Sequence, residues 1–180
     1  TIHMAQKITF STPKGIAAYP YITRADFEYN PEGIFKTKIK MSAEDAAPLM
    51  KAIEQAAADE FGSKAKSARM PFKKLDDTNE VEFATKSKFK PKVVDSTGKT
   101  IPETAVPNIY GGSVIKVAGT IFPYNQNGNV GISLQMGGVQ IVELAESMGA
   151  ASISFDAEEG GFVAANDNGA EATDGASYNF

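Results

Sequence analysis

Residues 34–40 read Ile34-Phe35-Lys36-Thr37-Lys38-Ile39-Lys40, and their strict alternation decides the fold. Successive side chains of a β-strand point to opposite faces of a sheet, so the three lysines share one face. Phe35, Thr37 and Ile39 share the other face. The segment from Glu82 to Lys90 repeats this arrangement. One face is expected to hold Phe83, Thr85, Ser87 and Phe89, and the opposite face Lys86, Lys88 and Lys90.

Other short segments also have the pattern of strands. Strand-like runs cover residues 6–10, 114–122, 130–136 and 139–144. In the run from Val114 to Phe122, one face holds Ile115, Val117 and Ile121 and the other holds Lys116, Thr120 and Phe122, with Tyr124 just beyond Pro123. Short strands separated by Gly, Asn and Pro turns predict a mostly β fold, a small antiparallel β-barrel. A β-sandwich is the main alternative.

A single α-helix is expected from Ser42 to Gly62. Ser42 suits the N-cap, acidic residues follow in the first turn, and Gly62 suits the C-cap. Leu49 and Ile53 recur at helical spacing. We interpret this helix as a brace for the barrel, and we favour packing over self-association as the role of its alanine-rich face.

The two lysine faces are the main functional clue. Like charges on neighbouring positions repel one another, so such rows add little stability. Ordinary solvation or protection of a sheet edge would explain one row. Two rows, with Lys116 on a third strand, favour a surface that binds a polyanion, because lysines match phosphates as point charges.

Aromatic residues near these rows could stack on nucleic-acid bases, and such stacking tolerates any base sequence. For each aromatic, packing in the core is the alternative. The candidate DNA-binding residues are Lys7, Tyr19, Tyr21, Lys36, Lys38, Lys40, Lys86, Lys88, Lys90, Lys116, Phe122 and Tyr124.

The composition argues against an enzyme. The 180 residues include no cysteine, and the one histidine, His3, precedes Met4, which we read as the natural start. Thiol chemistry, histidine triads and most zinc sites are therefore not expected. Asp76-Asp77 fits a solvated turn better than a Mg²⁺ site. The sequence Gly98-Lys99-Thr100 lacks the first glycine of a phosphate-binding loop, so residues 95–98 are read as a hairpin turn. No cofactor or metal is expected. No apolar run approaches the ~18 residues of a membrane-spanning helix, so no membrane partner is expected.

Charge is distributed unevenly along the chain. The net charge is −4, yet all 18 basic residues lie at or before Lys116, where 14 acids leave a net charge of +4. The last 64 residues hold eight acids and no Lys or Arg. Residues 156–180 have the composition of a disordered acidic tail, and the chain ends Tyr178-Asn179-Phe180. A frayed end is one reading of this terminus, and a peptide that docks on a partner is the other. The partner-binding candidates are Asp167, Glu171, Asp174, Tyr178 and Phe180.

In these features and in several short sequence blocks, the chain resembles the single-stranded DNA-binding proteins of short-tailed coliphages and their relatives. The densest matching block is Gly111-Gly112-Ser113-Val114-Ile115-Lys116-Val117. Shorter blocks, in the same order over most of the body, are Ala5 to Ile8, Tyr19 to Phe27, Pro31 to Lys36, Met70-Pro71-Phe72, Val93 to Lys99, Phe122-Pro123-Tyr124 and Val142 to Ala145, and the acidic tail ends in Phe180.

The resemblance implies an OB fold that coats single strands at the replication fork, in the cytoplasm of an infected bacterium. It implies that the tail contacts the polymerase and the helicase-primase and competes for the DNA groove. Tyr124 matches a DNA-contacting tyrosine of the family, Lys86 a basic contact and Phe180 the terminal aromatic residue. Lys7 falls in a basic N-terminal block.

This chain departs from the family at Glu32, where the family can use Arg, and its tail is less acidic, which favours partner docking over strong self-inhibition. The family resemblance also implies a homodimer, although we identify no residue in this sequence that indicates one.

We therefore expect an OB-fold single-stranded DNA-binding domain over residues 4–150 and a flexible acidic tail over residues 151–180. Met4 is read as the natural start. The alternatives are a phage structural or assembly module without DNA affinity, and a recombination mediator or RNA-binding protein that uses the same surface.

Overall fold

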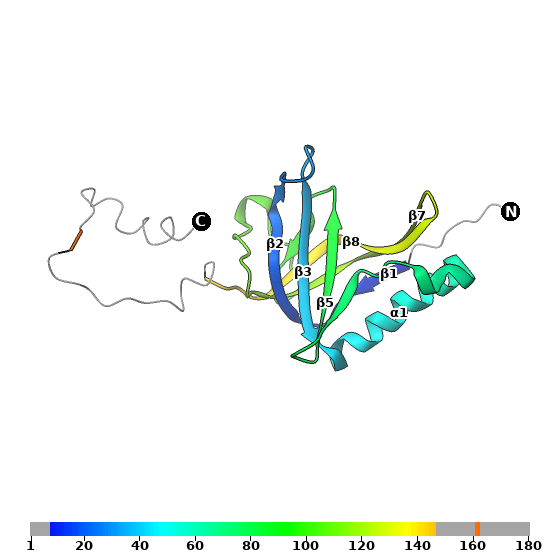
Figure 1. Ribbon diagram of the computed structural model, residues 1–180. Helices are drawn as coiled ribbons and strands as arrows, with labels where there is room; N and C mark the ends of the chain where they lie inside the picture. Colours follow the sequence, from blue (N-terminus) through cyan, green and yellow to red (C-terminus); the bar gives the residue numbers. More distant parts are fainter. Residues whose placement is uncertain (1–7, 147–160, 163–180) are drawn as a thin grey trace.

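The computed structural model describes residues 8–146 and 161–162 (Figure 1). The elements are β1 (Ile8–Ser11), β2 (Gly15–Asp26), β3 (Ile34–Ser42), α1 (Ala43–Phe61), the 3₁₀ helix η1 (Gly62–Ser67), β4 (Phe72–Leu75), β5 (Glu80–Ser87), β6 (Lys92–Val94), the 3₁₀ helix η2 (Glu103–Ala105), β7 (Val114–Gln126) and β8 (Asn129–Glu143). The expected tail, residues 151–180, lies outside the described residues except for 161–162.

Five strands close into a ring, because the pairing order runs β7-β2-β3-β5-β8 and β8 pairs again with β7. This is the five-stranded barrel of the OB fold. The expected mostly β fold with one α-helix is therefore confirmed. The barrel is not antiparallel throughout, since β5 and β8 run parallel at Thr85–Leu134 and Lys86–Gln135. β1, β4 and β6 extend the sheet beside β7, β5 and β8.

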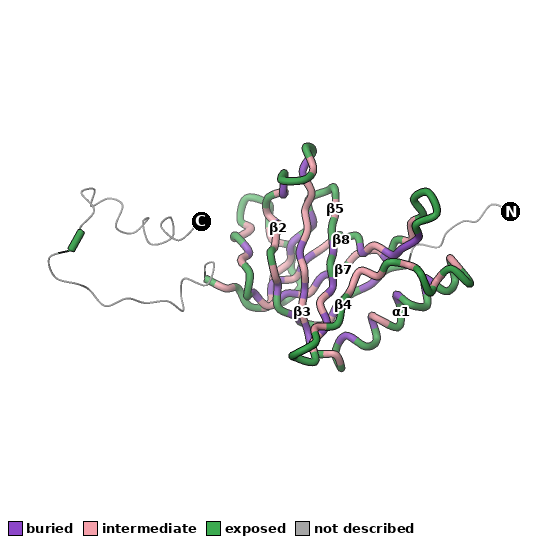
Figure 2. Tube along the Cα trace, viewed as in Figure 1, coloured by how far each residue is buried: buried purple, intermediate pink, exposed green. Residues whose placement is uncertain are grey.

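The alternation of residues 34–40 holds in β3. Thr37 and Ile39 are buried, and the intervening lysines are half-buried on the outer face. Phe83 lies opposite Ile39 in the register of β3 and β5, and both side chains are fully buried. Ile115 and Val117 of β7 complete this part of the core. Buried positions consequently alternate with half-buried and exposed ones along the barrel strands (Figure 2).

Helix α1 lies at the lower end of the barrel in Figure 1 and has the predicted caps. The Ser42 hydroxyl accepts a hydrogen bond from Asp45 N at 3.1 Å, and the Gly62 N–H donates to Ala58 O. Ala46, Leu49 and Ile53 are buried, with Ala56 and Ala57. The alanine-rich face therefore packs against the barrel. No helix in residues 8–146 and 161–162 is long and apolar enough to cross a membrane.

The strand predictions need correction at several places. Residues 129–143 form one strand and not two, because a bulge at Gly137 lets pairing continue while it switches the buried face. β5 ends at Ser87, whose hydroxyl accepts from Phe89 N at 3.0 Å and turns the chain. Phe89 is therefore 80% exposed and does not share the buried face. β2 was not anticipated, because Pro20 interrupts its pattern, and β4 and β6 were not anticipated either. β7 continues through Pro123 to Gln126, beyond the predicted end at Phe122.

Gly119 lies where the backbones of β7 and β8 approach closely. A Cβ added there would lie 1.8 Å from Gln135 O, whereas a Cβ on Gly137 would come no closer than 3.8 Å to another atom. We expect Gly119→Ala to lower the free energy of unfolding by at least ~2 kcal/mol, because backbone cannot move aside as a side chain can. Gly137→Ala, the matched control, should change it by less than ~1 kcal/mol. Urea unfolding measures both, and equal stabilities would contradict the close approach.

Candidate nucleic-acid interface

A row of one tyrosine and two lysines crosses the outer face of β2, β3 and β5. Tyr21 lies opposite Lys36, and Lys36 lies opposite Lys86. The Lys36 ammonium is 5.5 Å from the centre of the Tyr21 ring, and the Arg24 guanidinium carbon is 6.0 Å from it. We call Tyr21, Lys36 and Lys86 the tyrosine–lysine row. It places two cations side by side next to an aromatic ring that already has cation–π contacts.

Asp26 holds Lys36 in place. The Lys36 ammonium lies 2.7 Å from the Asp26 carboxylate, which also accepts a hydrogen bond from Glu28 N at 3.0 Å. Hydrogen bonding to Lys36 is the main cause that holds the pKa of Asp26 below its usual 3.8, and the Glu28 N–H adds to it. The Lys36 ammonium is thus fixed in the middle of the row, between Tyr21 and Lys86, and the Asp26 carboxylate eases its repulsion from Lys86. Lys86 is exposed and pairs with no acid among the described residues.

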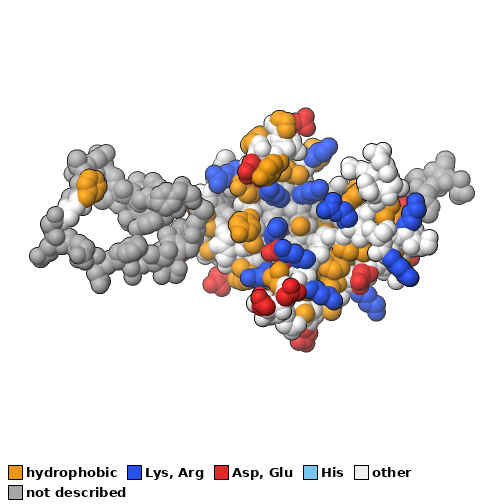
Figure 3. Space-filling model, in the orientation of Figure 1, with side chains coloured by type: hydrophobic (Ala, Val, Ile, Leu, Met, Phe, Trp, Pro, Cys, Tyr) orange, Lys and Arg blue, Asp and Glu red, His pale blue; other side chains and the backbone are white. Residues whose placement is uncertain are grey.

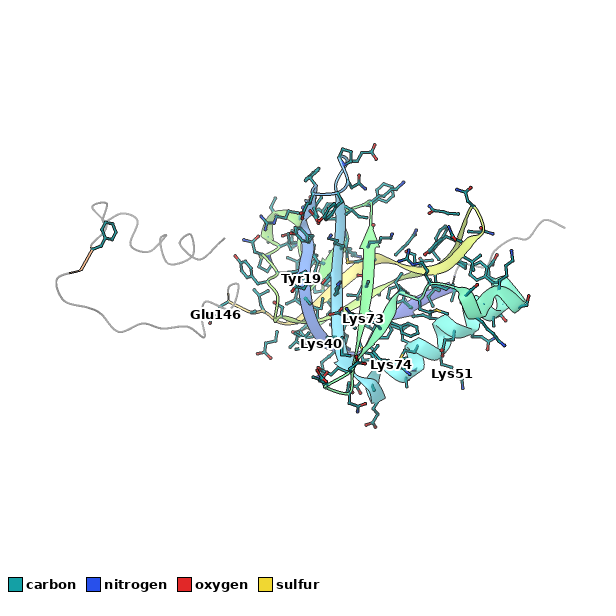
Figure 4. The ribbon with its side chains drawn as sticks, viewed as in Figure 1. Tyr19, Lys40, Lys51, Lys73, Lys74 and Glu146 are labelled. Atoms are coloured by element: carbon teal, nitrogen blue, oxygen red, sulfur yellow. The ribbon has the colours of Figure 1, made fainter. Side chains whose placement is uncertain are left out.

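The lower part of the same face is neutralised by acids. Glu82 lies 3.8 Å from both Lys38 and Lys73, and Glu80 lies 4.0 Å from Lys40. The outer face of β5 therefore runs from acids at its start to Lys86 near its end, and the expected all-lysine surface is corrected to a half-neutralised one. In Figure 3, basic side chains cross the middle of this face while acidic ones gather toward its lower end. Figure 4 shows Lys40 and Lys73 in that lower region.

Exposed aromatic side chains lie at the end of the barrel beyond the tyrosine–lysine row. Phe27 is 63% exposed and Tyr29 is 86% exposed in the loop of residues 27–33 between β2 and β3. The Phe27 ring lies over Gly33, where a Cβ would come within 2.7 Å of it. Phe89 lies at the same end, because Ser87 pairs with Phe35 at the start of β3. One ring face of Phe27 is thus packed while the side chain remains available to solvent.

Four residues at this end of the face were not predicted from the sequence as binding residues: Arg24, Phe27, Tyr29 and Phe89. An available signal was the pairing of aromatics with the turn residues Asn30-Pro31-Glu32-Gly33, which typically place their neighbours on a loop. In OB folds the face of the second and third barrel strands and the loop before them bind oligonucleotides. Here those strands are β3 and β5, and that loop is residues 27–33.

Tyr19 lies at an irregularity in β2. The register slips between Ala18 and Tyr21, and Tyr19 has a φ of 49°, a left-handed conformation that is uncommon for a tyrosine. Its side chain is 76% exposed and lies beside β2 (Figure 4). Tyr19 therefore flanks the tyrosine–lysine row, whereas Tyr21 belongs to it.

Phe122 and Tyr124 lie together on the hairpin of β7 and β8. Phe122 is 46% exposed. The Tyr124 ring lies over Gly131, its cross-strand partner, where a Cβ would come within 2.4 Å of the phenol oxygen. Lys116 precedes Tyr124 by eight positions in β7, a separation of ~26 Å along the strand at ~3.3 Å per residue. The structure consequently does not bring Lys116 beside these aromatics.

The remaining sequence candidates fall elsewhere. Lys88 and Lys90 lie beyond the end of β5, and Lys90 contacts Glu103 at 3.1 Å. Lys7, Asp167, Glu171, Asp174, Tyr178 and Phe180 lie outside the described residues.

The residues that suggested other chemistry form turns. Gly98 has a φ of 88°, and the Asp95 carboxylate accepts from the Thr97 hydroxyl, Thr97 N and Lys99 N. The Thr97 hydroxyl is the main cause that lowers the pKa of Asp95. The predicted hairpin turn is confirmed, and Asp76-Asp77 forms the turn between β4 and β5. Residues 8–146 and 161–162 contain no cluster of three or more potential metal ligands.

Comparison with known proteins places this chain among phage proteins. A family model described as the single-stranded DNA-binding protein of Enterobacter phage Enc34 matches residues 34–170. The single-stranded DNA-binding protein of Enterobacteria phage T3 is 30% identical, with 81% of each chain covered. That of Escherichia phage T7 is 30% identical, with 89% of this chain and 87% of the T7 protein covered.

Solved structures agree with the fold. The crystal structure of a single-stranded DNA-binding protein encoded by bacteriophage T7 superposes with a TM-score of 0.63 at 28% identity, covering 89% of this chain and 100% of the other. The Enc34 protein in complex with single-stranded DNA also gives a TM-score of 0.63. It is 14% identical, and the match covers 77% of this chain and 88% of that one. At that identity the likeness concerns the fold.

The contact between Asp26 and Lys36 predicts a specific pH dependence. Since folding lowers the pKa of Asp26, its contribution to stability is complete above the usual value of 3.8 and is lost as the pH falls through the lowered pKa. We expect Asp26→Asn to be less stable than the wild type at neutral pH and the two to converge in acid. Unfolding measured across the acidic range checks this. A difference that stays constant with pH would contradict the role of the ionised carboxylate.

Proposed function

This chain belongs to the family of phage single-stranded DNA-binding proteins, and from that premise we propose that it binds and protects single-stranded DNA without sequence preference during phage DNA replication and recombination. Members of the family are DNA-binding proteins and not enzymes. The infected bacterial cytoplasm is the proposed place of action.

The tyrosine–lysine row is the observation that carries this proposal. Lys36 and Lys86 stand directly opposite one another, although like charges at that spacing repel. Asp26 already balances the charge of Lys36, so a bound phosphate would chiefly balance the charge of Lys86 and remove its repulsion from Lys36. Tyr21, beside them, offers a ring that can stack on any base. The row thus supplies both components of sequence-independent binding to a single strand.

The exposed aromatics at the end of the barrel extend this surface. We place Phe27 and Tyr29 beside the row as further stacking residues, with Tyr19 at its edge. Lys38 and Lys40 have a smaller part, because Glu82 and Glu80 share their charge. Binding is therefore directed toward the loop of residues 27–33 and away from the end of the barrel that α1 covers.

The acidic C-terminal segment is proposed to have two roles. Its acids can occupy the cationic face when DNA is absent, and DNA then displaces them. The freed segment with Tyr178 and Phe180 recruits replication proteins, a polymerase or a helicase-primase, as the family resemblance implies. An aromatic ring beside a terminal carboxylate suits capture by a cationic, partly apolar groove on such a partner. A homodimer stays a prediction for which none of the described residues gives direct support.

Titration of a labelled oligothymidine at several salt concentrations tests DNA binding. We expect tight binding at low salt and a linear fall of log affinity with log salt, because bound phosphates release counterions. Lys86→Ala should weaken binding roughly tenfold and reduce the slope by ~0.7. Lys38→Ala, which removes an equal charge that Glu82 already shares, should have a clearly smaller effect.

The outcomes of this titration are decisive. An absence of binding at low salt would contradict the proposed function and favour a structural or assembly module. Equal effects of the two substitutions would contradict the assigned centre of the interface. Parallel titrations with duplex DNA and RNA distinguish an RNA-binding protein.

Deletion of residues 156–180 tests the competition by the tail. We expect the shortened chain to bind oligothymidine about two- to tenfold more tightly at low salt, with the difference shrinking as salt screens the acids. Phe180→Ala in the full chain is the matched variant, because it keeps every acid and should leave DNA affinity unchanged while it weakens binding to a replication protein. Unchanged or weaker DNA binding after the deletion would contradict tail competition.

A further inference from the structure

Arg69 lies where β5 and β8 separate. Arg69 N donates to Val130 O at 3.0 Å, and Ile132 N donates to Arg69 O at 2.9 Å. These bonds make a parallel bridge between Arg69 and Gly131 of β8. Two residues later, Pro71 O accepts from Ala84 N at 2.8 Å. Residues 69–71 therefore bridge the gap that opens between β8 and β5, and Arg69 continues the sheet beside the hairpin.

This bridge fixes the face on which Arg69 presents its side chain. Paired residues in neighbouring strands direct their side chains to the same face, and Gly131 pairs with Tyr124 on its other side. Arg69 and Tyr124 consequently flank Gly131 on one face, two strand spacings or ~10 Å apart. Gly131 has no side chain, so the space above it is occupied by the ring of Tyr124.

The same face includes the tyrosine–lysine row. Lys86 pairs with Gln135, and Gln135 and Gly131 are four residues apart in β8, so both point outward. The separation along the strand is ~13 Å. Phe122 lies between the two places, opposite Ser133. An unbroken outward face thus runs from Lys86 across β8 to Arg69 and Tyr124.

The charge of Arg69 is not balanced locally. Its side chain is exposed and forms no ion pair with any acidic residue of the part of the chain that the structure describes. Lys38, Lys40 and Lys73 on the neighbouring strands are all within 4.0 Å of a carboxylate. Guanidinium also binds phosphate through two parallel hydrogen bonds and stacks on bases, which ammonium cannot do.

We propose that Arg69 is a DNA-binding residue that forms, with Tyr124, a second anchoring point for one strand. The guanidinium of Arg69 binds a phosphate while the ring of Tyr124 stacks on a base. The strand passes from the tyrosine–lysine row across β8 to the hairpin and turns away from the neutralised lysines of β3. This inference rests on the proposed function and specifies the path of the DNA strand over the protein surface.

A comparison of short and long oligothymidines tests this path. The long one, of about 20 nucleotides, exceeds the ~4–16 nucleotides that one OB fold covers, and the short one of roughly three engages a single anchoring point. Arg69→Ala in the full-length chain should weaken binding of the long one roughly fivefold to tenfold and lower its salt slope by ~0.7. Binding of the short one should change less than twofold, since it settles on the stronger tyrosine–lysine row.

Two variants serve as controls. Lys51→Ala removes an equal charge from α1, away from this face (Figure 4), and should change neither affinity nor slope. Arg69→Lys keeps the positive charge but lacks the paired N–H donors of a guanidinium. It should therefore keep the salt slope of the wild type and recover part of the affinity that Arg69→Ala loses. Arg69 contacts β8 through its backbone, so all three variants should unfold at the urea concentration of the wild type.

The outcomes separate the path from the function. If the wild type binds DNA and Arg69→Ala behaves like Lys51→Ala, the second anchoring point is wrong while the proposed function stands. Equal losses for short and long oligothymidines would also overturn the path. If the wild type binds neither the short nor the long oligothymidine, the proposed function itself fails.

Discussion

The register between β3 and β5 is the constraint on which the structure and its proposed function depend. It places Ile39 against Phe83 inside the barrel and, in the same step, Lys36 against Lys86 outside it. Because side chains alternate along a strand, a shift of one residue would bury the lysines and expose the core. Burial of the apolar face therefore holds two like charges at a distance they would otherwise avoid. Core packing thus holds Lys86, which has no acidic partner among the described residues, beside Lys36, where a bound anion can balance its charge.

Acidic side chains decide where on this surface an anion fits best. Glu80 and Glu82 lie on the outer face of β5 and offset the lower lysines of β3, while Asp26 fixes Lys36 at the upper end. Net charge would not reveal this division, because acids and bases alternate over a few ångströms. Lys86 and Arg69 have no such acidic partner among the described residues. A strand that follows them crosses β8 and meets Phe122 and Tyr124 on the hairpin.

Much of this was accessible from the sequence. Alternation gave the faces of β3 and of the first part of β5, and the capping residues gave α1 to within a residue. Sequence alone could not show which acids approach which lysines, because Glu82 reaches Lys38 and Lys73 only after three strands pair. Nor could it show that Gly137 continues a strand, since a bulge and a turn look alike in sequence. Arg69 belongs to no alternating or helical pattern in the sequence, and only its bridge to Gly131 shows that it lies on the outer face of the barrel.

The central claim is that one strand of DNA lies across the outer face from the tyrosine–lysine row to the hairpin. Amide chemical shifts recorded by NMR while oligothymidine is added to the full chain test this most directly. The account predicts the largest changes at Tyr21, Lys36, Lys86, Tyr124 and Arg69, with small changes along α1 and around Lys40. Changes concentrated on α1 or around Lys40 and Lys73, with the tyrosine–lysine row unaffected, would contradict it.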